Sequence, residues 1–429
     1  MPRQPLDLAP FRGLRYVAPD VDRFIDGGFD LARLLAPPYD IPDAEEAREL
    51  QRSDPHNAAR VTLPFELSRQ APQGGDTASR RYRAAADLLR DWIDEGVLAL
   101  DEAPALYVYE QTAADGRVQR GLVGALGLPE QGPEAGVPAV RPHEDVADPP
   151  VRDRFRLMEV ARANLEPIFL VYRGAGGAAS AATEATGSRD TPLVSARTRD
   201  GARHSLWAIT DPELQREVSA DLAARSALIA DGHHRYAAYL RLRRENTDPG
   251  WSHGLALLVD SDTHPPRLGA IHRVLPGLDT DRALRAAREV AAVEPVPDAD
   301  PAALAGADAP ALLLVSAGGD AHLVSGFDEG ALERAMPDRS PDWRHLATAA
   351  LHEVLMPLWD YPEERVRMVH EDPAEAAAAA RSEKGTAVIV PPLHVDQVYA
   401  VADRGELTPR KSTSFGPKPR TGLVMRTLR

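Results

Sequence analysis

The chain has 429 residues and a formal net charge of −15 at pH 7, and 43% of its residues are hydrophobic. This length exceeds what one compact core usually holds, so we expect two or three packed α/β domains. The acidic balance argues against a nucleic-acid partner, because a general nucleic-acid binder carries a basic face. Cysteine is absent, which excludes disulfides, thiolate catalysis and cysteine-ligated zinc.

The apolar runs of the chain are all short. Neither the first residues nor any later stretch is long enough for a signal peptide or a membrane span. We therefore expect a soluble protein without a membrane partner. The lack of cysteine fits the reducing cytoplasm, where we expect the protein to reside.

Residues 1–130 predict an N-terminal α/β domain. Prolines exclude a helix around residues 37–38, where Pro-Pro-Tyr-Asp predicts a rigid turn. The elements predicted after it are a helix over 45–50 capped by Asp43, an amphipathic helix over 82–93, and a hairpin whose strands, 105–112 and 118–128, flank Asp115-Gly116.

Residues 131–278 predict a central domain that follows a link rich in Gly and Pro. Short apolar strands alternate with helices here, which is the pattern of α/β units. Residues 174–187 are rich in Gly, Ala, Ser and Thr and predict a flexible surface loop. The predicted strands are 168–172, 206–209, 227–230 and 255–260, and the predicted helices are 152–164 and 235–244.

Residues 279–400 predict a third, C-terminal α/β domain. Its predicted strands are 311–315 and 388–390, and its predicted helices are 346–358 and 374–381. The remaining residues, 401–429, are basic and interrupted by Pro and Gly. We expect this tail to pack back onto the core.

The sharpest local signal is Ala230-Asp231-Gly232-His233-His234-Arg235, where an apolar strand turns into a helix. The start of a helix exposes N–H groups and a partial positive charge, so anions bind there. Gly232 allows a close approach of the backbone, and Arg235 adds a bidentate donor. Asp231 either holds a magnesium ion or caps the helix. The plainer alternative is a capped helix with two surface histidines.

A second signal is Pro142-His143-Glu144, followed by Asp153-Arg154. A carboxylate beside a histidine is suited to a general base or a metal ligand. A metal centre built from His143, Glu144, His233 and His234 is an alternative. It is a poor one, because neighbouring residues on a helix point about 100° apart.

Lysine is almost absent from the chain, where arginine replaces it nearly everywhere. The lysines are Lys384, Lys411 and Lys418, and two of them lie in the segment that contains Lys411-Ser412-Thr413. A compact ammonium suits a phosphate group where the fork of an arginine fits badly. The alternative is a coding bias that favours arginine over lysine, with these lysines remaining by chance.

Several motifs together resemble the bacterial domain-of-unknown-function 1015 family. The resemblance covers nearly the whole chain, with the motifs in the family's order. They are Pro37-Pro38-Tyr39-Asp40, Pro55-His56-Asn57, Leu63-Pro64, Pro142-His143-Glu144, Asn164-Leu165-Glu166-Pro167-Ile168, Ala230 to Arg235 and Lys411-Ser412-Thr413.

The Asp231 to Arg235 segment is also similar to that of the free serine kinases, which belong to the ParB/sulfiredoxin-like superfamily. This resemblance implies a multi-domain α/β (α+β) fold with a ParB/sulfiredoxin-like nucleotide-binding core and mixed sheets flanked by helices. It implies that the segment holds nucleotide phosphates and that Glu144 matches the catalytic glutamate. The long insertion around these motifs departs from the kinases and leaves the substrate open.

The resulting hypothesis is a cytoplasmic kinase that uses ATP or ADP with Mg²⁺ to phosphorylate a small hydroxylated metabolite, with free L-serine as the leading acceptor. The expected catalytic residues are Glu144, His233 and Arg235. The expected phosphate-binding residues are Asp231, Gly232, His233, His234, Arg235, Lys411, Ser412, Thr413 and Lys418, with Asp231 and Glu144 as metal ligands. The expected substrate contacts are Tyr39, Asp40, His143, Asp153 and Arg154.

Two other functions remain open at this point. The first is a ParB-like nucleotide-binding switch or scaffold without a small-molecule acceptor, and the second is a phosphoester hydrolase that uses Glu144 and His233. A homodimer is also left open.

Overall fold

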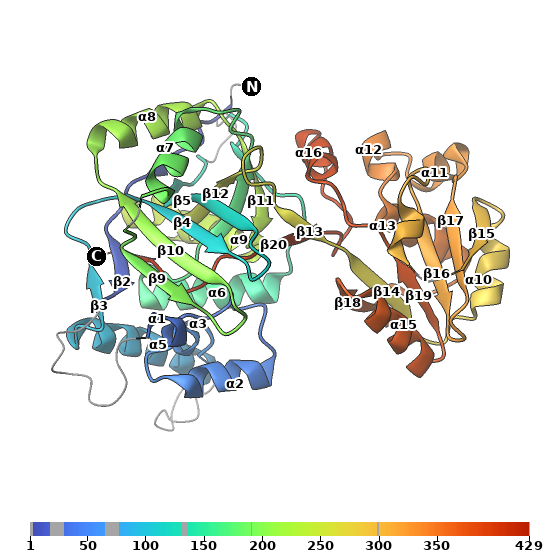
Figure 1. The fold of residues 1–429 in the computed structure, drawn as a ribbon, viewed down its shortest axis with the longest axis horizontal. Helices are drawn as coiled ribbons and strands as arrows, with labels where there is room; N and C mark the ends of the chain where they lie inside the picture. Colours follow the sequence, from blue (N-terminus) through green and yellow to red (C-terminus); the bar gives the residue numbers. More distant parts are fainter. Residues whose placement is uncertain are drawn as a thin grey trace. The chain divides into compact units, whose positions relative to one another are not determined.

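The computed structural model describes residues 3–17, 30–64, 77–130, 136–189, 191–297 and 300–428. The chain divides into two compact units, and Figure 1 shows its course. The first unit holds residues 1–141, 146–266 and 417–429. The second holds residues 142–145 and 267–416.

Nine of the described strands form one mixed sheet in the first unit. They are β1 (Leu8–Ala9), β4 (Leu106–Thr112), β5 (Val118–Gly127), β6 (Val140–Arg141), β8 (Ile168–Tyr172), β9 (Val194–Arg197), β10 (Arg203–Ile209), β11 (Ala227–Asp231) and β12 (His253–Asp260). The order is β6-β11-β8-β12-β5-β4-β10-β9, with β1 paired to β5. The pairs β8–β12 and β6–β11 are parallel, and the other pairs are antiparallel.

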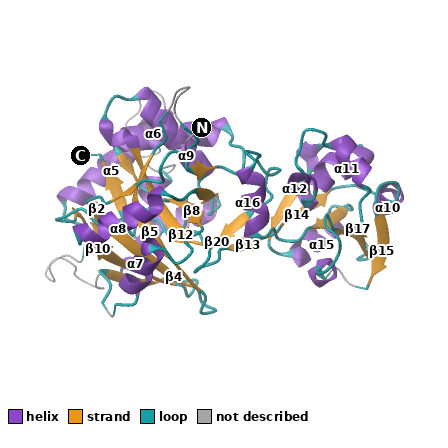
Figure 2. Ribbon diagram, turned by 90° about the horizontal axis from the view of Figure 1, so that it is seen from above, coloured by secondary structure: helices purple, strands orange, loops and turns teal. Residues whose placement is uncertain are grey.

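The described α-helices of the first unit are α1 (Leu31–Leu34), α2 (Ala44–Ser53), α3 (Ala59–Thr62), α5 (Thr77–Asp94), α6 (Asp148–Ala161), α7 (Ala178–Gly187), α8 (Pro212–Ala223) and α9 (His233–Glu245). Helices α6 to α9 share one core with this sheet, and α2 and α3 pack in a separate small cluster. Alternate strand residues such as Leu106 and Val108 pack in the same cluster as Phe155 of α6 and Tyr239 of α9. Helices α6 and α9 contact each other, as Figure 2 shows. The core therefore fixes the direction of α9.

A smaller sheet joins both ends of the chain. It contains, in order, β3 (Leu98–Leu100), β2 (Gly13–Tyr16), β21 (Met425–Thr427) and β7 (Ala163–Asn164). Figure 1 places the C-terminus beside β2 and β3. The last residues are thus part of the first unit.

The second unit is built on a six-stranded antiparallel sheet among its described residues. Its order is β15 (Ala292–Val296), β17 (Ala321–Ser325), β16 (Leu312–Ser316), β19 (Thr386–Ile389), β14 (Ile271–Leu275) and β18 (Arg367–His370). The core of the unit includes Leu313, Ile389 and Ala380. A separate pair joins β13 (Arg267–Gly269) to β20 (Ser414–Gly416).

Short helices complete the second unit. They are α10 (Thr280–Ala287), α11 (Glu329–Ala335), α12 (Pro341–Arg344), α13 (Ala347–Ala349), a π-helical segment (Ala350–Leu355), α14 (Met356–Leu358), α15 (Pro373–Ser382) and α16 (Val395–Asp403).

Most local predictions from the sequence are confirmed, and so is the mixed α/β class. Asp43 caps α2 by accepting hydrogen bonds from the backbone N–H groups of Glu45 and Glu46. Strands β4 and β5 form the hairpin predicted around Asp115-Gly116. The loop predicted over residues 174–187 is wrong, because residues 178–187 form α7 and bury Ala179 and Ala182 in the core.

The predicted boundary at residue 130 also differs from the structure. Strands β4 and β5, which precede it, share one sheet with β8, β11 and β12, which follow it. None of the described helices is both long enough and apolar enough to cross a membrane.

Candidate functional site

We use "α9 corner" for Asp231 to Arg235, where β11 ends and α9 begins, together with Lys418 and Asp40. Asp231 is the last residue of β11, and Gly232 caps α9 with a left-handed backbone (φ 93°). A Cβ atom at Gly232 would lie 3.0 Å from Cγ2 of Ile168 and 3.2 Å from Nε of Arg235. Both the backbone angle and this crowding require glycine. Because glycine has no side chain, no side chain caps the first turn of α9.

Arg235 is a buried cation in the first turn of α9, with only 2% of its surface exposed. Its Nη1 donates to the carbonyl of Pro167 at 2.6 Å, and its Nη2 donates to Oδ2 of Asp231 at 2.6 Å. Its Nε is buried and has no hydrogen-bond acceptor among the described residues. Burial disfavours the charge, but the carboxylates of Glu166, Asp231 and Asp40 outweigh this effect and raise the pKa of Arg235.

Lys418 completes the α9 corner from the far end of the chain. Its Nζ lies 2.5 Å from Oδ1 of Asp231 and 3.3 Å from Oδ2 of Asp40. Burial opposes the charge on Lys418, yet the two carboxylates raise its pKa. Burial likewise opposes the charge on Asp40, but Lys418 and Arg235 lower the pKa of that carboxyl group.

Tyr39 lies next to the α9 corner, close to two guanidinium groups. The Cζ atoms of Arg154 and Arg235 lie 4.1 Å and 5.8 Å from the centre of its ring. Glu166 fixes this arrangement, because its Oε1 accepts hydrogen bonds from the N–H of Tyr39 at 2.9 Å and from Thr421 Oγ1 at 3.0 Å. Burial raises the pKa of Tyr39 to about 12, so its hydroxyl stays protonated at neutral pH.

Asp153 and Arg154, which the sequence predicts as substrate contacts, bind each other. Nε of Arg154 donates to Oδ2 of Asp153 at 2.9 Å, and its Nη1 donates to the carbonyl of Thr62 at 2.9 Å. Asp153 also accepts a hydrogen bond from Tyr82 at 2.7 Å. Burial opposes the charge on Asp153, but Arg154 and then Tyr82 lower the pKa of the carboxyl group. These contacts therefore connect Asp153 and Arg154 to Thr62 and Tyr82 and hold both side chains in place next to Tyr39.

The two histidines of the α9 corner are both half-buried. His233 is the first residue of α9, and Nε2 of His234 accepts a hydrogen bond from the N–H of Ala147 at 3.3 Å. This contact ties the start of α9 to the segment just before α6. A direct catalytic role for His233 remains a prediction.

The other predicted residues lie together in the second unit. Nε2 of His143 lies 2.8 Å from Oγ1 of Thr413, and Oε1 of Glu144 accepts the N–H of Lys411 at 3.2 Å. Ser412 is buried and lies 2.8 Å from the hydroxyl of Thr348. We call His143, Glu144, Arg273 and Lys411 to Thr413 the second-unit cluster.

Arg273 belongs to the second-unit cluster, although the sequence analysis missed it. It is completely buried on β14, and its Nη2 donates to the carbonyls of Arg410 and Lys411 at 3.2 and 2.9 Å. Nε of Arg273 faces Nε2 of His352 at 3.3 Å. Burial lowers the pKa of Arg273 to about 10, against the weaker opposite effects of Glu363 and Glu144.

Glu166 was missed as well, although it stands in the motif Asn164 to Ile168. A glutamate between apolar residues, just before a buried strand, is the signal that could have found it, because buried carboxylates need cationic or hydrogen-bonding partners. Across the described ranges, no group of three or more histidine, aspartate or glutamate residues is placed to hold a metal ion. The magnesium role of Asp231 and Glu144 stays a prediction.

The α9 corner has several features that are typical of anion sites. It contains the start of helix α9 and the buried guanidinium of Arg235, whose Nε has no acceptor among the described residues. It also contains the ammonium group of Lys418, which pairs with two carboxylates. Backbone N–H groups and fixed cations of this kind bind phosphate groups elsewhere in proteins.

Comparisons with known proteins agree with the motif analysis on the family. A family model described as "Protein of unknown function (DUF1015)" matches residues 8–354. No curated protein matches the chain.

Several solved structures are similar to the chain at low identity. A free serine kinase in complex with AMP is 16% identical, with a TM-score of 0.35, and the match covers 67% of this chain and 88% of that one. A conserved hypothetical protein from Pyrococcus furiosus is 14% identical, with a TM-score of 0.33 and coverage of 66% and 92%. SbnI with C-terminal truncation, from Staphylococcus aureus, is 11% identical, with a TM-score of 0.37 and coverage of 71% and 87%.

Proposed function

The chain belongs to the DUF1015 family, and we propose that it is a nucleotide-dependent kinase that phosphorylates a small hydroxylated metabolite. The observation that carries the proposal is the buried Nε of Arg235, which has no acceptor among the described residues and lies beside the start of α9. A buried N–H without a partner is costly unless a ligand satisfies it. We propose that a phosphate oxygen of the nucleotide is this acceptor.

Lys418 supplies the second positive charge of the proposed phosphate site. Without a ligand, its ammonium group is neutralised by Asp231 and Asp40. Phosphoryl transfer depends on neutralising charge on the transferred group, and a lysine does this as a point charge. We propose that Lys418 exchanges its carboxylate partners for the phosphates when the nucleotide binds.

We propose that Mg²⁺ binds at the same residues. Asp231 and Asp40 direct two carboxylate oxygens at one cation, Lys418 Nζ, and carboxylate oxygens are the ligands that Mg²⁺ prefers. When bound, the ion would neutralise charge on the phosphates. Asp231 and Asp40 are the residues that would hold it.

Free L-serine is the proposed acceptor, with O-phosphoserine as the product. This finer proposal rests on the motif similarity of Asp231 to Arg235, and the role of Glu144 as general base rests on sequence similarity alone. Glu144→Gln keeps an oxygen that can accept the N–H of Lys411, so the loop should stay in place. We expect the variant to lower kcat by a factor of about 10² to 10⁴, with unchanged nucleotide affinity.

One assay separates the proposed kinase from its rivals. Purified protein is incubated with Mg²⁺ and either ATP or ADP, with and without L-serine, and phosphorus NMR follows nucleotide, phosphate and O-phosphoserine. The proposal expects O-phosphoserine only when both nucleotide and serine are present. Wild-type protein that makes no O-phosphoserine from either nucleotide overturns the serine assignment.

Two further arms identify the rival functions. Release of phosphate from O-phosphoserine without nucleotide would identify a hydrolase instead. Slow nucleotide hydrolysis with nucleotide-dependent oligomerisation, and no phosphorylated acceptor, would identify a ParB-like switch. Either outcome overturns the kinase proposal.

A further inference from the structure

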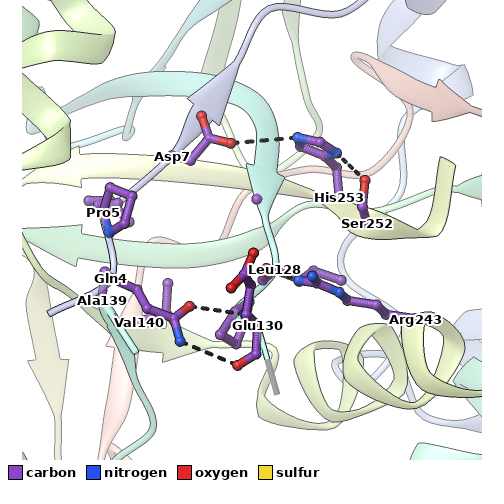
Figure 3. A pocket seen from close by; sticks show the side chains of 13 residues that line it. Gln4, Pro5, Asp7, Leu128, Glu130, Ala139, Val140, Arg243, Ser252 and His253 are labelled. Atoms are coloured by element: carbon purple, nitrogen blue, oxygen red, sulfur yellow. Dashed lines mark hydrogen bonds and ion pairs between the residues drawn. The ribbon is translucent and has the colours of Figure 1, made fainter. Parts of the chain in front are cut away.

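A cavity of about 420 Å³ lies in the first unit, and none of its lining residues belongs to the α9 corner. It is formed where the segment before β1, the end of β5, the start of β12 and the last turn of α9 meet (Figure 3). A volume of this size is in the range of small-molecule sites. The residues that line it show which chemistry it would accept.

Arg243 contributes a cation to the cavity. One of its Nη atoms donates to the carbonyl of Leu128, and no carboxylate of the described residues forms an ion pair with it. Its neighbours on α9 differ, because both Arg241 and Arg244 pair with Glu245. The guanidinium of Arg243 therefore has its charge available for an anionic group.

Carboxylates lie elsewhere on the wall of the same cavity. Asp7 is half-exposed, and its Oδ2 lies 3.6 Å from Nε2 of His253. Glu130 contributes a second carboxylate to the lining. Figure 3 shows Asp7 and Arg243 reaching the cavity from different elements, the segment before β1 and helix α9. Asp7 and Arg243 thus offer separate positions for a positive and a negative group.

Ser252, His253 and Asp7 are not arranged as a nucleophilic triad. The hydroxyl of Ser252 donates to the carbonyl of Pro249 at 2.6 Å. Its oxygen also lies 2.8 Å from Nδ1 of His253. The 3.6 Å between Oδ2 of Asp7 and Nε2 of His253 is too long for the hydrogen bond that orients a catalytic histidine.

The rest of the lining is apolar. It includes Pro5, Leu6, Leu128, Pro129 and Val140. Apolar walls with a few placed charges are typical of sites for small molecules that have both polar and hydrocarbon parts.

We propose that this cavity binds an α-amino acid with an apolar side chain, whose carboxylate pairs with Arg243 and whose ammonium group faces Asp7. The hydrocarbon side chain packs against the prolines and aliphatic residues of the wall. A lone anion would leave Asp7 without a cation, and a lone cation would leave Arg243 without an anion. A zwitterion satisfies both charges.

Isothermal titration with L-leucine and L-phenylalanine, in the absence of nucleotide, tests the proposal. We expect binding of at least one of them by the wild-type protein. Arg243→Gln and Asp7→Asn should each weaken the affinity about tenfold or more, because hydrogen bonds to charged groups are lost. Arg243→Lys should recover part of the loss, which would show that Arg243→Gln acts through charge and not through misfolding.

The controls separate this site from the α9 corner. Arg244→Gln, on the next residue of the same helix, should leave leucine binding unchanged, and so should Lys418→Met. 4-Methylpentanoate and 3-methylbutylamine, which each lack one charged group, should bind more weakly than leucine. The proposal is overturned if neither amino acid binds, if Arg243→Gln binds as well as wild type, or if Lys418→Met alone abolishes binding. None of these results depends on kinase activity.

Discussion

The α9 corner and the second-unit cluster each contain a buried arginine, but the two are held in opposite ways. Arg235 pairs with the carboxylate of Asp231, and carboxylates around it raise its pKa. Arg273 is completely buried among backbone carbonyls, and burial lowers its pKa to about 10. Carboxylates therefore balance the charge of Arg235, whereas backbone carbonyl groups accept the hydrogen bonds of Arg273.

This difference indicates different roles for the two arginines. A cation paired with carboxylates, next to a lysine that is paired in the same way, can exchange those partners for a phosphate group. A guanidinium that binds the carbonyls of Arg410 and Lys411 holds a loop in position, including the left-handed backbone of Lys411 (φ 57°). We therefore propose that the α9 corner binds the ligand and that Arg273 holds the loop in position.

Replacing each arginine by methionine should give the largest difference between the two sites in the free energy of unfolding that is lost. Arg235→Met leaves Asp231 buried with one partner fewer, and breaking such a pair destabilises by about 3–5 kcal/mol. Arg273→Met removes an unbalanced charge together with its hydrogen bonds, so we expect a smaller loss of about 1–3 kcal/mol. Urea unfolding followed by tryptophan fluorescence measures both values.

Hydrogen exchange then shows which unit each substitution destabilises. Peptides from α9 report on the first unit, and peptides from β14 report on the second. Arg244→Met, on the exposed side of α9, is the control and should change stability by less than about 0.5 kcal/mol. An Arg273→Met variant that is less stable than Arg235→Met would contradict the contrast.

Acid should lower the free energy of unfolding of both units, because each contains a buried neutral histidine. Burial lowers the pKa of His204 and of His272 to about 4. Between this value and the ordinary pKa near 6.5 the unfolded chain binds more protons than the folded chain, so stability is lost as the pH falls from about 6.5 to 4. Each histidine should account for about 2–3 kcal/mol at the acidic end of this range.

Single substitutions separate the two units in this acid response. Unfolding free energies of His204→Gln and His272→Gln, measured from pH 7 to pH 4, should each show a flatter dependence than wild type. Hydrogen exchange should place the effect in the first unit for His204 and in the second unit for His272. An unchanged slope in both variants would refute the assignment of neutral buried histidines.

The smallest expected difference in stability is between alanine substitutions at two glycines. Gly232 and Gly405 both have a left-handed backbone, with φ of 93° and 77°. A Cβ at Gly232 would meet Ile168 and Arg235, but a Cβ at Gly405 would meet nothing within 4 Å. Gly405→Ala should lose about 1–2 kcal/mol from backbone strain alone, and Gly232→Ala should lose more. Equal losses would show that the first turn of α9 is not crowded.

The sequence could predict the turn from β11 into α9 because its residues are contiguous. Asp231 to Arg235 lie within this single strand-to-helix turn, and an anion site there remains a prediction. The approach of Lys418 to Asp231 and Asp40 spans most of the chain, and only the scarcity of lysine indicated that residue. The buried positions of Glu166 and Arg273 depend on tertiary packing, which no local pattern encodes.

Sheet order and one helix could not be predicted for related reasons. The hairpin of β4 and β5 is specified by its Asp-Gly turn, but the pairing of β5 with β12 joins distant segments. Residues 174–187 combine glycines with alanine, serine and threonine, a composition that suits a loop. The glycines at 174, 176 and 177 precede α7, and burial of Ala179 and Ala182 stabilises the helix after them.

Nucleotide titration of lysine variants tests the central claim most directly. Isothermal titration of ATP and ADP, with Mg²⁺, compares wild-type protein with Lys418→Met and with the matched control Lys384→Met, whose side chain is exposed in the second unit. We expect wild type to bind nucleotide, Lys418→Met to bind about tenfold more weakly or worse, and Lys384→Met to match wild type. Wild-type protein that binds neither nucleotide, or a Lys418→Met variant that binds as tightly as wild type, would contradict the account.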